Sequence, residues 1–106
     1  MKHLTAFILS ANTYDEAVVK DIESIDDGIF SPVAPSYTNN IYYSTGGTPI
    51  KWDKHEEDMK KLSKKYPDIE FKLEGIEIDT YIVWLKYFLD GKRIGKKILP
   101  VREING

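Results

Sequence analysis

Hydrophobic and polar positions change their period along the chain, and the changes predict the order of its elements. Alternation with a period of two predicts strands over residues 2–10, 41–43 and 68–74. Apolar residues recur at helical spacing in two other segments, at Tyr14, Val18, Ile22 and Ile25 and at His55, Met59, Leu62 and Tyr66. These stripes predict two amphipathic helices, and a strand through Val18 and Val19 is the alternative for the first.

Both predicted helices have capping signals. Thr13 and Glu16 have the spacing of a capping box, in which each side chain satisfies a free amide group at the helix start. Asp53, with Glu56 three residues later, is the expected N-cap of the second helix. Pro67 cannot continue that helix and therefore predicts its end.

The segment from residue 78 to residue 100 predicts a β-hairpin. Asp90-Gly91 stands between two β-rich runs, and this pair favours a two-residue type I′ turn. A regular ladder from this turn pairs Phe88 with Arg93 and Trp84 with Lys97. One face of the hairpin, predicted to belong to the core, then carries Tyr81, Val83, Leu85, Tyr87, Ile94 and Ile98. The other face carries Ile82, Trp84, Lys86, Phe88, Arg93 and Lys97.

The predicted order is therefore β-α-β-α-β-β-β in one domain of residues 1–106. Residues 28–39, with two prolines, are expected to form an irregular connector, and Gly75 is expected to end the third strand. The pattern predicts an α+β fold in which two helices pack on one face of a mostly antiparallel sheet. The opposite face of such a sheet would be partly bare.

The amino-acid composition excludes several kinds of site and of protein. The chain has no cysteine, which excludes disulfides and thiolate metal sites and is consistent with a cytoplasmic location. Its apolar runs are too short to cross a bilayer, and we expect no membrane association. The formal net charge of −2 is too small for a histone-like nucleic-acid binder.

One phrase of the sequence matches a known family. The segment from Leu62 to Asp68, LSKKYPD, ends a predicted helix and precedes a strand. In this it resembles the small ferredoxin-like domains of the YubB type that phages and plasmids encode. The resemblance covers about the last two-thirds of the chain, and the tryptophan-rich motif expected before Tyr42 is missing. It implies a ferredoxin-like fold and a mobile-element origin, and it carries over no catalytic residues.

The residues suggest no catalytic constellation. His55 lies near Glu56 and Asp58, but the sequence lacks the H-E-x-x-H spacing and a second nearby histidine, so we expect no metal site. Residues 44–48, STGGT, lack the spaced glycines and the lysine of a phosphate-binding loop. We therefore expect no enzymatic activity and no cofactor.

The mixed aromatic and basic face of the hairpin is the candidate binding surface. Its predicted partner-binding residues are Trp84, Lys86, Phe88, Arg93 and Lys97. Three interpretations remain open. The first helix or the 28–39 connector covers the rings, the face binds a protein, or the face stacks single-stranded nucleic acid.

These observations lead to one functional hypothesis and its main alternative. The hypothesis is a small non-enzymatic phage or mobile-element protein that binds and blocks a host protein or nucleoprotein complex, for instance as an anti-CRISPR-like counter-defence inhibitor. The alternative is an accessory protein that binds single-stranded nucleic acid. A homodimer is compatible with either.

Overall fold

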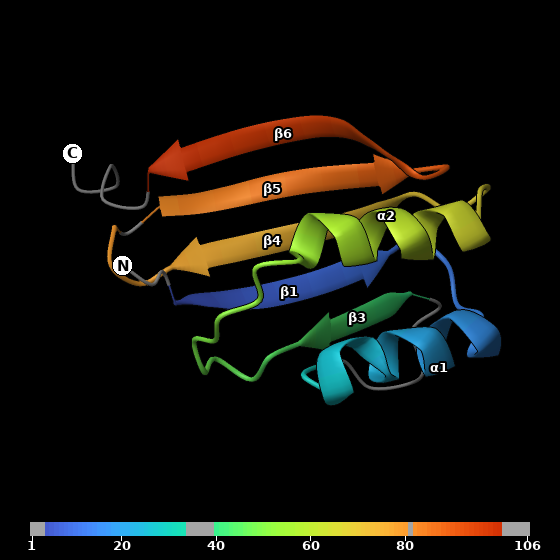
Figure 1. The fold of residues 1–106 in the computed structure, drawn as a ribbon, viewed down its shortest axis with the longest axis horizontal. Helices are drawn as coiled ribbons and strands as arrows, with labels where there is room; N and C mark the ends of the chain where they lie inside the picture. The colour runs from blue at the N-terminus through green and yellow to red at the C-terminus, as the bar shows by residue number, and fades with distance from the viewer. Residues whose placement is uncertain (1–3, 34–39, 81, 101–106) are drawn as a thin grey trace.

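The chain forms a six-stranded antiparallel sheet with two helices on one of its faces (Figure 1). The computed structural model describes residues 4–33, 40–80 and 82–100. The strands are β1 (Thr5–Ala11), β2 (Ser31–Pro32), β3 (Ile41–Ser44), β4 (Phe71–Glu77), β5 (Ile82–Leu89) and β6 (Lys92–Pro100). The helices are α1 (Glu16–Glu23) and α2 (His55–Lys65), and a single 3₁₀ turn, η1 (Ile25–Asp27), follows α1. The predicted α+β class is confirmed.

The strands lie in the order β2-β3-β1-β4-β5-β6. Strand β1 takes an inner position, which suits a strand whose residues are nearly all buried or half-buried. Strand β6 forms one end of the sheet, next to β5. Of the predicted 28–39 connector, residues 34–39 fall outside the described residues, and Ser31–Pro32 form the short strand β2.

The hydrophobic core fills the space between the two helices and the sheet. The helices contribute one buried stripe each, Val18 and Ile22 from α1 and Met59 and Leu62 from α2. The strands contribute Phe7, Leu9, Ala11, Ile41, Tyr43, Phe71, Leu73, Trp84 and Phe88. The predicted helical stripes are thus present, except that Tyr14 precedes α1 and is exposed.

Both predicted N-caps are wrong. Helix α1 begins at Glu16, so Asp15 is its cap, and the Asp15 carboxylate accepts the amide hydrogens of Ala17 and Val18. Thr13 lies two residues before this cap, so the predicted capping box with Glu16 does not form. Helix α2 begins at His55 and has no side-chain cap.

Tertiary packing positions the start of α2 instead of a cap. Trp52 is buried just before the helix, and its indole N–H donates to the Asp58 carboxylate over 2.8 Å. The Trp52 carbonyl accepts the backbone N–H of His55 over 3.3 Å. The predicted cap Asp53 lies exposed between these anchored residues.

The predicted turn of the hairpin is present, but farther from the turn the pairing of the two strands is shifted by one residue. Asp90 and Gly91 have φ values of 52° and 80°, as the turn requires. Phe88 pairs with Arg93 as predicted, whereas the next residue, Tyr87, pairs with Gly95. Ile94 is therefore the extra residue of a β-bulge, and from there outward every predicted pair is off by one.

The prediction of the hairpin's core face is wrong. Trp84 and Phe88, assigned to the outer face, are buried, whereas Val83 and Leu85 are only half-buried. Ile98, also assigned to the core, is 56% exposed. Of the other members of the predicted core face, Tyr87 is half-buried and Ile94 is exposed. Tyr81 lies outside the described residues.

The cap of α1 gives a direct test of its observed start. We expect Asp15→Ala to lower the free energy of unfolding by about 1 kcal/mol, because the amides of Ala17 and Val18 lose their acceptor. Thr13→Ala should change it by less than about 0.5 kcal/mol. Urea unfolding followed by circular dichroism measures both, and a larger loss for Thr13→Ala would contradict this helix start.

Candidate functional site

The predicted site centres on Trp84, whose indole lies on the backbone of Gly75 in the neighbouring strand. The two residues are directly paired, and a Cβ atom placed on Gly75 would lie 2.2 Å from the Trp84 ring. Gly75 therefore does not end β4, as predicted from its breaking tendency, but lies inside it. Only glycine leaves room for the ring at this position.

Two aromatic side chains, one from β1 and one from α2, contact this tryptophan. The His55 ring stacks on Trp84 with centroids 5.2 Å apart, and Phe7 meets Trp84 edge-to-face at 5.9 Å. Phe7 also packs edge-to-face against Trp52, at 5.0 Å. The Trp84 indole N–H donates to the Glu77 carboxylate over 3.1 Å. The ring is thus held on both its faces and at its polar edge.

An ion pair between a buried lysine and a half-buried glutamate lies beside the rings. Lys86 is 8% exposed, its Nζ atom lies 4.5 Å from the centre of the Trp84 ring, and it contacts the Glu56 carboxylate at 2.9 Å. Arg93 reaches the same carboxylate at 2.7 Å. Burial would raise the pKa of Glu56, but the hydrogen bond and charge of Lys86 and the charge of Arg93 outweigh it and lower that pKa.

The hydrogen bonds around His55 define its tautomer. Lys86 Nζ lies 2.8 Å from His55 Nε2, and an ammonium group can only donate, so Nε2 accepts. His55 Nδ1 therefore carries the proton and donates to the Trp52 carbonyl over 3.1 Å. Burial, followed by the charge of Lys86, lowers the pKa of His55 from its ordinary value of 6.5. His55 is therefore neutral in this arrangement, and it is half-buried at the edge of the core.

Three of the five predicted partner-binding residues lie under a helix. Trp84, Lys86 and Phe88 are buried on the face that α2 covers, so the covered interpretation is the one observed. The cover is α2, not the first helix or the 28–39 connector. Arg93 lies at the rim of α2, next to Glu56, and Lys97 lies on the opposite face, across from Leu85. Partner binding by these residues stays a prediction, and it would require α2 to leave the sheet.

The face of the sheet opposite the helices, which we call the open face, has a graded composition. The strand registers arrange its side chains in three rows. The first row is apolar, with Ala6, Ile76, Val83 and Leu99. The second is mixed, with Ser44, Ile8, Glu74, Leu85 and Lys97. The third is mostly polar, with Tyr42, Ser10, Lys72, Tyr87 and Gly95. No described helix or strand covers these rows, and Tyr42 and Leu99 are 41% and 42% exposed.

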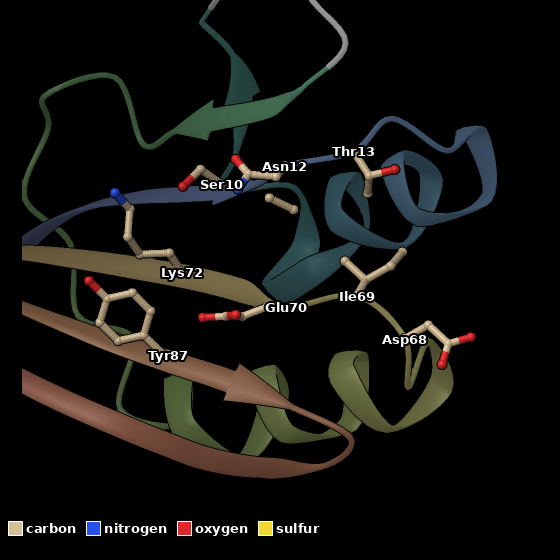
Figure 2. A pocket seen from close by; sticks show the side chains of 9 residues that line it. Ser10, Asn12, Thr13, Asp68, Ile69, Glu70, Lys72 and Tyr87 are labelled. Carbon is tan, nitrogen blue, oxygen red and sulfur yellow. The ribbon is translucent and has the colours of Figure 1, made fainter.

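A polar hollow of about 600 Å³ lies at the polar end of the open face (Figure 2). Strands β1, β4 and β5 supply Ser10, Lys72 and Tyr87, which the register places in one row. The segment after β1 adds Asn12 and Thr13, and the segment before β4 adds Asp68, Ile69 and Glu70. Figure 2 shows Ser10, Asn12, Glu70, Lys72 and Tyr87 gathered toward one side of the hollow.

Sequence reasoning predicted a partly bare sheet face but assigned the wrong hairpin side chains to it, and it missed the hollow. Their residues were the predicted core of the hairpin and ordinary alternating positions of the other strands. The available signal was in β4 and β5, where Ile76, Val83 and Leu85 form a second apolar set beside Trp84 and Phe88. Two apolar sets on one strand indicate that one of them is exposed or covered by another molecule.

Comparison with known proteins adds no assignment. No protein-family model, no curated protein and no solved structure matches this chain. Neither described helix has the length and apolar character needed to cross a membrane. Within residues 4–33, 40–80 and 82–100, no three histidine or acidic side chains are grouped so as to hold a metal ion.

The close approach of Trp84 to Gly75 predicts a large effect of one methyl group. Gly75→Ala should destabilise the fold by about 1–3 kcal/mol, because the new Cβ would collide with a ring that is held on both faces. Gly95→Ala is the matched control, since its Cβ would lie 3.5 Å from Tyr87, an ordinary contact. Urea unfolding of both variants checks this, and equal stability of the two would contradict the packing.

The lowered pKa of His55 predicts a pH dependence of stability. Protonated His55 would lie against the Lys86 ammonium, so the folded chain binds this proton more weakly than the unfolded chain. The contribution of neutral His55 is present above pH 6.5 and is lost as the pH falls below it. The unfolding free energy should therefore fall between about pH 7 and pH 5.5.

The variant His55→Gln does not titrate and retains an acceptor for Lys86. Its unfolding free energy should change less than that of the native chain over the same pH range. The carboxylates with lowered pKa values, Glu56 and Asp21, lose their contributions only at lower pH, below their ordinary pKa values of 4.5 and 3.8. Parallel pH profiles for the two proteins would refute the assignment.

Proposed function

We propose that this protein is a small non-enzymatic binding protein that uses the open face of its sheet to bind a partner protein. The observation that carries the proposal is the apolar row of that face. Ile76, Val83 and Leu99 lie side by side on three adjacent strands, and no described element covers them. Ile76 and Val83 are half-buried and Leu99 is 42% exposed, and a contiguous apolar row of this kind is typical of protein interaction sites.

The arrangement of charges on the open face supports a protein partner. Glu74 and Lys97 flank Leu85 in the second row, so the apolar row is bordered by charges of both signs. Apolar centres with polar rims are the usual anatomy of protein interfaces. On the helix face, α2 covers Trp84 and Phe88, and Ile98 next to Trp84 is the exposed apolar side chain.

We further propose that the fold is ferredoxin-like with an added hairpin. The order β2-β3-β1-β4 supports it, since α1 precedes β2 and α2 connects β3 to β4. Strands β5 and β6 then extend the sheet beyond β4. Two-layer domains of this kind leave one sheet face open, and that is the face to which we assign binding.

The identity of the partner is a further part of the proposal. The resemblance to YubB-type domains supports a phage or plasmid origin, and therefore a host protein or nucleoprotein complex as the target. Binding would block that target, and the most specific form of the proposal is that the protein is a counter-defence inhibitor. The geometry supports only the binding surface.

One observation favours the alternative of single-stranded nucleic acid. Tyr42 and Tyr87 lie in the same row of the open face as Lys72, and aromatic rings beside cations can stack bases and contact phosphates. Glu70 and Glu74 lie on or next to the same surface and oppose phosphate binding. Affinity for an oligonucleotide that falls steeply with salt would favour this alternative.

Photocrosslinking in the organism that carries the chain tests the proposal. A photoreactive phenylalanine analogue replaces Tyr42 or Leu99 on the open face, or, as a matched control, Tyr14 or Glu57 away from it. All four positions are exposed, so the analogue should leave the core unchanged. We expect one discrete protein adduct from Tyr42 and Leu99 and none from the control positions.

A charge-introducing variant makes the same test more stringent. Val83→Asp places a carboxylate in the apolar row and should abolish the adduct formed from Tyr42, provided that the circular dichroism spectrum is unchanged. Glu57→Lys on the outer side of α2 should leave the adduct intact. Adducts of equal yield from the open face and the control positions, or none from any position, would refute the proposal.

A further inference from the structure

The polar hollow has a structural origin that differs from that of the apolar row. It lies where β1 ends before α1 and where the connection from α2 enters β4, at the opposite end of the open face from Ile76 and Val83. Its volume of about 600 Å³ falls in the range of about 300–1,000 Å³ that small-ligand sites occupy. It is thus large enough for a ligand of its own.

The hollow presents hydrogen-bonding groups that its neighbours do not use. Five polar side chains from three strands and two connections gather there: Ser10, Asn12, Glu70, Lys72 and Tyr87. In the described part of the chain, these side chains form no hydrogen bond or ion pair with one another or with other residues. They contrast with the Lys86 cluster on the other face, where each charged group has a partner.

The charges of the hollow select against an anion. Lys72 is its single cation, whereas Asp68 and Glu70 are two carboxylates. A phosphate or carboxylate ligand would meet this excess of negative charge, and a simple cation would meet Lys72. A ligand without net charge satisfies both constraints.

Hydroxyl groups on a ligand would match the hydrogen-bond donors and acceptors that line the hollow. The hollow offers strong donors at Lys72 and Tyr87, strong acceptors at Glu70 and Asp68, and both kinds at Asn12. A hydroxyl group donates and accepts at once, so adjacent hydroxyls can bond an ammonium and a carboxylate together. The half-buried ring of Tyr87 adds an apolar wall for C–H groups.

We infer that the hollow binds a neutral polyhydroxylated ligand, a sugar unit or the end of a sugar chain. Lys72 and Tyr87 would donate to its hydroxyls, and Glu70 and Asn12 would accept from them. This inference does not depend on the protein partner proposed above, because its residues lie outside the apolar row.

Titration followed by two-dimensional ¹⁵N NMR tests the inference. The probes are the methyl glycosides of glucose, galactose, mannose and N-acetylglucosamine, together with maltotriose and chitotriose. With at least one probe we expect saturable shifts at the backbone amides of residues 10–13, 70–72 and 87. Lys72→Met and Asn12→Ala should each weaken the binding roughly tenfold, as expected for the loss of a good hydrogen bond.

Lys97→Met is the matched control, since Lys97 is a cation of the open face that does not line the hollow. It should bind the same sugar with unchanged affinity. Three results would overturn the inference: no saturable shift with any sugar, equal affinity of all three variants, or shifts in the hollow produced only by inorganic phosphate or a short single-stranded oligonucleotide. The last result would support the nucleic-acid alternative, and none of the three bears on the crosslinking from Leu99 in the apolar row.

Discussion

The position of the Trp84 ring on Gly75 is the constraint on which the rest of this structure depends. A ring of that size can lie flat between β4 and β5 only because the residue beneath it has no side chain. Once placed, it provides the surface on which His55 stacks, and His55 is the first residue of α2. The position of α2 on the sheet is therefore coupled to a single glycine in a strand.

The buried charges beside Trp84 add specificity to that contact. Lys86 bonds His55 and Glu56, which are neighbours in the first turn of α2, so this strand residue engages the helix at two successive positions. Lys86 is buried whereas Glu56 is half-buried, so loss of Glu56 would leave the lysine charge without its carboxylate partner. The pairing of Lys86 with two successive helix residues thus favours the observed position of α2 on the hairpin.

Much of the fold was predictable from local patterns, because helical periodicity and turn chemistry act over a few residues. The stripes of Val18 and Ile22 and of Met59 and Leu62 are present, and the turn at Asp90-Gly91 has the expected backbone. The bulge at Ile94 was not predictable, since no local signal distinguishes it from a regular ladder position. One extra residue moves every later side chain of β6 to the other face.

The candidate site was predicted on the wrong face for a related reason. Strand β5 is apolar on both sides, so its sequence alone does not decide which set faces the helices. The decision rests on long-range contacts, namely the space above Gly75 and the stacking partner His55. The two apolar sides of β5 are also informative once it is known which of them the helices cover. A strand that buries Trp84 and Phe88 under α2 and still presents Val83 and Leu85 on its other side has more apolar surface than this two-layer fold encloses. Such a surplus has no role in holding the two layers together, and we propose that a bound partner covers it.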